Sequence, residues 1–129
     1  MIRVAIIDDN PISRKELEKV LQTDPDIRVV AETGLSGIKE IEEQKPDVIL
    51  LDSKKPFTEC LETTETIVGK FENTRIIVLS MDSKSTLLPL HSKHTLEGSL
   101  CQVGACFHLC NNCSPEDILA AIRNGHQPG

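Results

Sequence analysis

The stretch of sequence that decides the fold is DVILLDSKKP, residues 47–56. Four apolar residues in a row, from Val48 to Leu51, predict a strand that is buried on both faces, as strands are in parallel sheets. The run ends on Asp52, and two lysines and a proline come shortly after it. A carboxylate at the end of a buried strand has either a structural or a chemical reason to be there, and the rest of the chain indicates which.

The composition is that of one ordinary domain with an aliphatic core. The chain has 129 residues, of which 39% are hydrophobic and only 2% aromatic, and this length is too short for two separate cores. The net charge of −6 argues against direct binding of nucleic acid by this domain, because phosphates are bound by basic surfaces. No apolar stretch is as long as a membrane span and the amino terminus lacks the regions of a signal peptide. We therefore expect a soluble, cytoplasmic domain that does not bind membranes, in which the five cysteines are reduced thiols.

Strand-like and helix-like segments alternate along the chain. Such alternation predicts an α/β fold with a doubly wound, five-stranded parallel sheet and helices on both faces. The last helix has the clearest end signals, with Ser114 as N-cap, Pro115 at the first helical position and Gly125 past the end. The expected strands are residues 3–7, 26–32, 47–51, 75–80 and 105–110, and the expected helices are residues 10–22, 36–44, 59–73, 95–103 and 114–125.

Three acidic residues and a serine follow or end the predicted strands. Asp8 and Asp9 leave the first strand, Asp52 the third and Ser80 the fourth, and the carboxyl ends of parallel strands share the edge of the sheet where ligands bind. Crowded carboxylates repel one another unless a cation is present, and oxygen ligands suit Mg²⁺ above all. Asp52 could then attack a phosphoryl group and form an aspartyl phosphate. The alternative for each acid taken singly is a helix cap or a turn residue.

The sequence resembles the receiver domains of two-component response regulators over nearly its whole length. The resemblance lies in VAIIDDN (4–10), KPDVILLDSKKP (45–56), IIVLS (76–80) and GACFHLCNNCSPEDILAAI (104–122). It implies the flavodoxin-like (βα)5 receiver fold for residues 1–125, with residues 126–129 as the start of a linker or tail. The stretches KPDVILLD and SPEDILAAI most resemble receivers that precede helix-turn-helix transcriptional output domains.

The resemblance also implies a role for each residue of the site. A sensor histidine kinase would phosphorylate the acceptor aspartate, and the shift between two packed states would alter a face made by the fourth helix, the fifth strand and the last helix, through which such domains often form homodimers. The domain itself is not expected to be an enzyme. The implied roles are phosphoacceptor for Asp52, magnesium ligands for Asp8, Asp9, Asp52 and the backbone carbonyl of Lys54, switch hydroxyl for Ser80, and switch aromatic position for His108.

The chain departs from the receiver pattern at several places, and two of them bear most directly on the site. Asn111 stands where the family has a lysine that pairs with the phosphoryl oxygens, and an amide forms weaker bonds to such oxygens than a charged group does. Lys54 or Lys55 could supply the missing charge, or lie in water. The connection formed by residues 81–103 is longer than is usual for a receiver. It could shield Asp52, form a partner surface, or be a disordered loop.

Cysteine and histidine residues gather in the last third of the chain, and such side chains suit zinc, copper or iron–sulfur centres. Among the cysteines, only Cys110 and Cys113 have the two-residue gap of a metal-binding pair, and buried free cysteines are common as small hydrophobic residues. A phosphorylation-independent interaction module is therefore the main alternative to a working receiver. A metal or redox sensor follows it, and a phosphatase is disfavoured because Lys54 stands where its second acid is expected. The cysteine and histidine residues of the possible metal or redox site are His91, His94, Cys101, Cys106, His108, Cys110 and Cys113.

Overall fold

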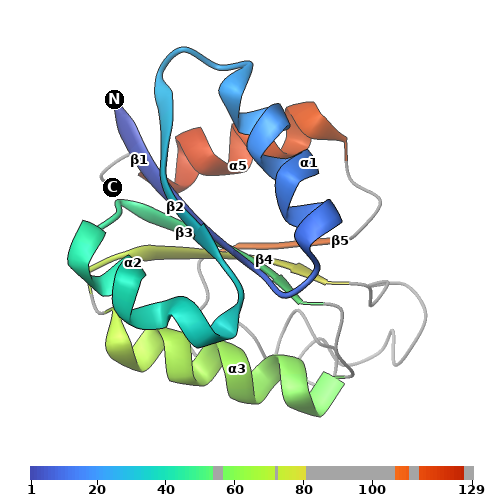
Figure 1. Ribbon diagram of the computed structural model, residues 1–129. Helices are drawn as coiled ribbons and strands as arrows, with labels where there is room; N and C mark the ends of the chain where they lie inside the picture. The colour runs from blue at the N-terminus through green and yellow to red at the C-terminus, as the bar shows by residue number, and fades with distance from the viewer. Residues whose placement is uncertain (54–56, 72, 81–106, 111–113, 127–129) are drawn as a thin grey trace.

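The computed structural model describes residues 1–53, 57–71, 73–80, 107–110 and 114–126 (Figure 1). These residues form a five-stranded sheet in the order β2-β1-β3-β4-β5, in which all neighbouring strands run parallel. This order confirms the predicted doubly wound α/β fold. The strands are β1 (Ile2–Asp8), β2 (Ile27–Thr33), β3 (Val48–Ser53), β4 (Arg75–Ser80) and β5 (Phe107–Cys110), and the helices are α1 (Pro11–Gln22), η1 (Leu35–Gly37), α2 (Ile38–Gln44), α3 (Phe57–Lys70) and α5 (Pro115–His126).

Several sequence predictions fall outside the described residues. They concern the helix expected at residues 95–103, the long connection at residues 81–103, the beginning of the fifth strand, and part of the site. The site and cluster residues in these segments are Lys54, Lys55, His91, His94, Cys101, Cys106, Asn111 and Cys113. In the described part of the chain, no helix is both long and apolar enough to span a bilayer.

The sheet lies between two layers of helices. In Figure 1, α1 and α5 cover one face and α2 and α3 cover the other. Alternate residues of β3 enter the two cores, because successive side chains of a strand point to opposite faces. Val48 and Leu50 pack in the α1/α5 core, Ile49 and Leu51 pack in the α2/α3 core, and all four are at most 2% exposed. The prediction of a strand buried on both faces is therefore confirmed.

The boundaries of most elements differ by one to three residues from those expected. Strand β3 continues two residues further than expected, to Ser53, so Asp52 still pairs with its neighbours in the sheet. A 3-10 turn, η1, precedes α2, which begins at Ile38 instead of residue 36. Helix α5 continues through Gly125 to His126, so Gly125 lies inside the helix and not past its end.

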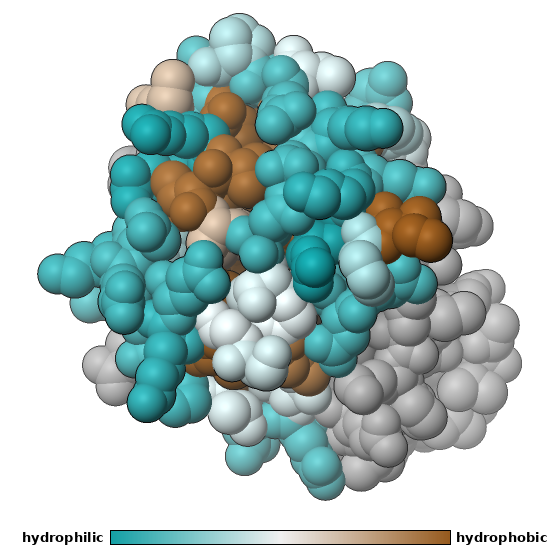
Figure 2. All heavy atoms as spheres, viewed as in Figure 1, coloured by the Kyte–Doolittle hydropathy of each residue, from teal (hydrophilic) through white to brown (hydrophobic). Residues whose placement is uncertain are grey.

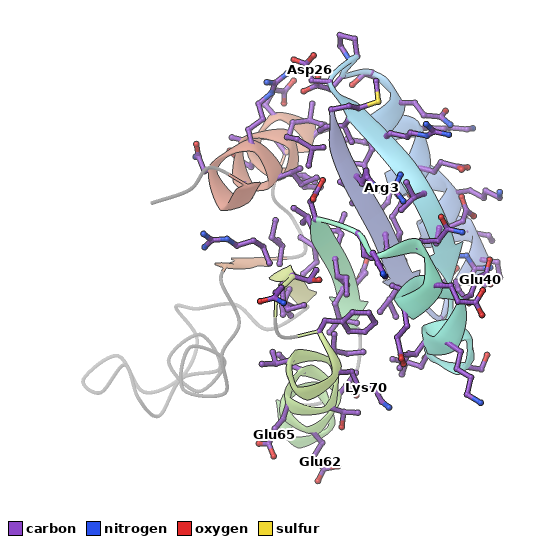
Figure 3. The ribbon with its side chains drawn as sticks, turned by 90° about the vertical axis from the view of Figure 1, so that its left-hand side faces the viewer. Arg3, Asp26, Glu40, Glu62, Glu65 and Lys70 are labelled. Atoms are coloured by element: carbon purple, nitrogen blue, oxygen red, sulfur yellow. The ribbon has the colours of Figure 1, made fainter. Side chains whose placement is uncertain are left out.

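The register between β1 and β3 is fixed where the two strands begin. The Asp47 carboxylate accepts a hydrogen bond from the backbone N–H of Arg3 at 2.9 Å, and the Asp47 N–H donates to the Arg3 carbonyl at 2.8 Å. The Arg3 side chain, labelled in Figure 3, donates to the carbonyl of Gln44 at 2.6 Å. Together these bonds fasten the α2–β3 connection to the start of β1.

The carboxyl-terminal helix is held at both ends by polar side chains. The Ser114 hydroxyl accepts from the N–H of Asp117 and the Asp117 carboxylate accepts from the N–H of Ser114, both at 3.2 Å, which confirms Ser114 as the N-cap. Towards the other end, the Arg123 guanidinium donates to both carboxylate oxygens of Asp24 at 2.7 and 2.8 Å, and to Asp26 at 3.1 Å. Figure 3 shows Asp26 at the end of the sheet beside α5. This pairing joins α5 to the turn between α1 and β2.

Replacing Asp24 by Asn is expected to lower the free energy of unfolding at neutral pH. The backbone N–H of Asp26, and then the guanidinium of Arg123, hold the pKa of Asp24 below its ordinary value. A carboxylate of this kind contributes stability above its unfolded pKa of about 3.9, and that contribution is lost as the pH falls through the folded pKa. Urea unfolding at a series of pH values should show wild type and Asp24→Asn differing at neutral pH and converging in acid.

The control for this comparison is Glu65→Gln, because Glu65 is an exposed residue of α3 that points away from the molecule (Figure 3). A difference between wild type and Asp24→Asn that persists undiminished in acid would show that the Asp24 charge does not hold α5 in place.

Candidate active site

The site lies where β1 and β3 end. Asp8 and Asp52 are directly opposite each other in the register of these strands, and their exposed fractions are 2% and 8%. The alternation that places Ile6 and Leu50 in the α1/α5 core puts both carboxylates on that same face of the sheet. In Figure 1 the arrowheads of β1 and β3 point to the same edge. These two carboxylates therefore lie at the same edge of the sheet, as the sequence predicts.

Asp8 has one oxygen with a partner and one without. Its Oδ1 accepts from the backbone N–H of Asn10 at 2.9 Å, whereas Oδ2 is buried and accepts no hydrogen bond from the described residues. Arg14 approaches the same residue, but its guanidinium donates to the main-chain carbonyl of Asp8, at 2.9 Å. A buried carboxylate oxygen without a partner is unfavourable, and a bound cation would remove that cost.

Asp9 is oriented by the neighbouring loop. It is exposed, and its Oδ1 accepts from the backbone N–H of Leu35, the first residue of η1, at 2.8 Å. Gly34 makes this contact possible, because a Cβ at Gly34 would lie 2.8 Å from the same oxygen. As they stand, the described residues contain no group of three His, Cys, Asp or Glu side chains that could hold a metal ion. The third carboxylate thus lies next to the Asp8–Asp52 pair without completing a three-carboxylate ligand set.

The first turn of α1 contributes two residues that the sequence did not indicate as part of the site. The Asn10 side chain caps the helix by accepting from the N–H groups of Ile12 and Ser13 at 2.9 and 3.2 Å. The Ser13 hydroxyl then donates to Oδ2 of Asp52 at 3.2 Å. An asparagine just before Pro11 is a typical N-cap signal and could have been recognised. Ser13 has no comparable signal, because its contact depends on how α1 crosses the sheet.

A pocket of about 510 Å³ opens beside the carboxylates. Asp8, Asp9 and Asp52 line it together with apolar side chains that include Ile12 and Leu35. Ile12 is 73% exposed although it belongs to α1, because it lies in the first turn, before the helix buries Leu17 and Leu21. Asp52 therefore forms part of the wall of this pocket.

The remaining predicted site residues are placed only through their backbone. Ser80 ends β4 and is opposite Ser53 of β3 and Cys110 of β5. His108 is the second residue of β5 and is opposite Val78. These positions agree with the strand assignments made from the sequence, whereas Lys54 and Asn111 lie outside the described residues.

The chain matches a known protein family. A family model described as the response regulator receiver domain matches residues 4–123. The chain belongs to this family.

Relatives of this receiver domain are found among several kinds of protein. The uncharacterized transcriptional regulatory protein YhcZ of Bacillus subtilis is 31% identical over 120 residues, which are 92% of this chain and 52% of that protein. A protein-glutamate methylesterase/protein-glutamine glutaminase of Syntrophus aciditrophicus is 40% identical over 80 residues, which are 60% of this chain and 23% of that enzyme. The response regulator domain of Thermotoga maritima CheB has a similar structure, with a TM-score of 0.76, 24% identity and 99% of each chain covered. The chain spans about half the length of the curated response regulators that it matches, and most of the enzyme is unmatched.

A second group of charges lies beside the receiver site, between α1 and β2. Oε1 of Glu32 forms an ion pair with Nζ of Lys15 at 3.1 Å and lies 3.7 Å from Nε of Arg14. The hydrogen bond to Glu32 raises the pKa of Lys15, and the charge of Glu18 adds to this effect. Burial alone would raise the pKa of Glu32, but the hydrogen bonds to Glu18 and Lys15 outweigh it and lower that pKa. Arg14 therefore links this charged group to the main chain of Asp8.

Replacing Asp8 by Asn should stabilise the metal-free receiver domain by roughly 1–2 kcal/mol. The amide oxygen can still accept the hydrogen bond from Asn10, while a neutral group takes the place of a buried anion beside Asp52. Urea unfolding in the presence of a chelator measures this difference. Glu62→Gln, an exposed site on α3 (Figure 3), removes the same charge away from the site and should leave the stability nearly unchanged. If Asp8→Asn were less stable than wild type under these conditions, the carboxylate would not be strained by its neighbours.

Proposed function

We propose that this receiver domain accepts a phosphoryl group on Asp52 from the phosphohistidine of a sensor histidine kinase. The observation that carries the proposal is the pairing of Asp52 with Asp8, whose second oxygen is buried without a described partner, at the mouth of a pocket. A purely structural role for Asp8 would leave this oxygen unfavourably placed. In a site that binds a cation and a phosphoryl group, this oxygen would be a ligand of the cation.

The proposed reaction is a single displacement at phosphorus. An oxygen of the Asp52 carboxylate forms a bond to phosphorus as the bond between phosphorus and the kinase imidazole nitrogen breaks. The nitrogen keeps the electron pair and takes up a proton. Asp52 is suited to this role because β3 holds its backbone between two neighbouring strands, so the carboxylate is presented in one place.

The residues present fit Mg²⁺ as the cofactor of this reaction. The free oxygen of Asp8 and the carboxylate of Asp52 would hold the ion with the backbone carbonyl of Lys54, and Asp9 would join them on release from Leu35. Magnesium commonly takes one or two carboxylates and completes its shell with water and substrate oxygens, so the carboxylates of Asp8 and Asp52 are enough to bind it. When bound, the ion would offset the negative charge of the incoming phosphoryl oxygens.

The proposed output is a change of partner surface. Ser80 and His108 occupy the switch positions of the family, and their rearrangement would alter a face that includes β5 and α5 and that could form a homodimer. We propose that this change regulates transcription through an output domain or partner, because relatives of about twice this length are transcriptional regulators by name. The negatively charged receiver domain would not itself bind nucleic acid, and it would work in the cytoplasm, where histidine kinases present their phosphohistidine.

The second candidate function is an interaction module that works without phosphorylation. Asn111 favours it, because the family lysine at this position would pair with the phosphoryl oxygens by charge-assisted bonds. The two candidates share the fold and differ in whether the phosphorylated state is ever reached.

Incubation with acetyl phosphate and Mg²⁺ should add one phosphoryl group to the wild-type protein, slowly and incompletely because Asn111 replaces the lysine. Intact-protein mass spectrometry measures the adduct. It should be absent in Asp52→Asn and present in Glu65→Gln, which removes a carboxylate from the exposed surface of α3. A wild-type protein that is never labelled, and whose partner binding is the same in Asp52→Asn, would support the phosphorylation-independent module. Rapid stoichiometric labelling would show that Asn111 is no handicap.

Magnesium should raise the free energy of unfolding of the wild-type protein by an amount that grows with concentration, about 2.7 kcal/mol at a hundredfold excess over the dissociation constant. The midpoint of thermal unfolding should rise accordingly. Asp8→Asn should abolish this increase, because Asp8 supplies the unpartnered oxygen. Asp9→Asn should only weaken it, because Asp9 must first leave Leu35. Potassium chloride at equal ionic strength is the control for general salt effects. Equal losses in the two variants, or a loss in neither, would contradict the proposed ligand set.

A further inference from the structure

We propose that Ser13 is a positioning residue for phosphoryl transfer, which holds the Asp52 carboxylate in the orientation that reacts. This inference rests on the proposed function of Asp52. It is carried by the hydrogen bond from the Ser13 hydroxyl to Oδ2 of Asp52, at 3.2 Å, between residues 39 apart in the sequence.

The Ser13 side chain is presented by a firmly fixed part of the chain. Asn10 caps the helix through the N–H groups of Ile12 and Ser13, and the N–H of Arg14 donates to the Asn10 carbonyl at 2.9 Å. Further along α1, Leu17 is buried in the core. Because the first turn is held at both of its ends, the half-buried Ser13 hydroxyl meets Asp52 at a set place.

Ser13 approaches Asp52 from the side away from the entrance. The 510 Å³ pocket is lined by Asp52 but not by Ser13. A second, smaller hollow between α1 and α5 is lined by both residues, together with Leu17 and Ile118. The hydroxyl can therefore bind the carboxylate while a phosphodonor enters from the other side.

A hydroxyl is suited to this role for an electrostatic reason as well. Asp52 is 8% exposed and lies opposite the carboxylate of Asp8. A donor to one of its oxygens limits rotation of the carboxylate, which is the proposed nucleophile. Since a hydroxyl is neutral, it does this without competing for the cation that the acid pair is proposed to bind.

The test compares the labelling kinetics of Ser13 variants with acetyl phosphate in saturating Mg²⁺. Ser13→Ala should lower the labelling rate at saturating acetyl phosphate by roughly two- to tenfold, the effect of losing one ordinary hydrogen bond. The concentration of acetyl phosphate that gives half the maximal rate should stay the same, because Ser13 does not line the entrance. Ser13→Thr should recover most of the rate and Ser13→Val should not, since these two side chains differ in the hydroxyl and hardly in shape.

The matched control is Thr23→Ala, which removes a hydroxyl bonded to the Val20 carbonyl at the far end of the same helix and should label like wild type. Thermal unfolding of each variant shows whether it is folded. Suppose that the wild-type protein is labelled. Equal labelling rates for Ser13→Ala and wild type, or for Ser13→Thr and Ser13→Val, would then overturn the role of Ser13 but not the proposed function. A wild-type protein that is not labelled at all would overturn the proposed function and this inference with it.

Discussion

The parallel pairing of β1 with β3 is the constraint on which the site depends. Val4 is opposite Val48, and the same offset continues to Asp8 opposite Asp52. The two carboxylates are therefore brought together by the pairing of the two backbones. At the other end of these strands the hydrogen bonds between Asp47 and Arg3 fix the offset. A slip of one residue would turn every side chain of a strand to the opposite face and separate the two acids.

The stability of the surrounding fold offsets the unfavourable free energy of burying these two carboxylates together. Both faces of β3 are covered by aliphatic side chains, and the helices that cover them are fastened by caps and by the pairing of Arg123 with Asp24. Among the described residues, the face seen in Figure 2 is mostly hydrophilic, with several separate apolar areas. An unfavourable placement of this kind is common at functional sites, because the rest of the structure fixes the position of the residues concerned.

The sequence was sufficient for the fold and for the centre of the site, for a simple reason. A buried apolar run that ends in Asp52, and the alternation of strands with helices, place Asp8 and Asp52 at one edge whatever the details of the loops. The orientation of Asp9 could not be predicted, because it depends on a 3-10 turn, and such turns have no helical periodicity to detect. The contact of Ser13 with Asp52 could not be predicted either, since it depends on the angle at which α1 crosses the sheet. The roles of Ser80, His108 and Asn111 stay predictions.

The central claim is that Asp8 and Asp52 share one divalent ion, and replacing Mg²⁺ by paramagnetic Mn²⁺ tests it most directly. In an amide NMR spectrum of the isotope-labelled protein, low concentrations of Mn²⁺ broaden the signals of residues near the bound ion. The signals of residues 8–10, 35 and 52 should broaden first, and excess Mg²⁺ should restore them. Broadening that begins at another acidic part of the surface, or that Mg²⁺ does not reverse, would contradict this claim.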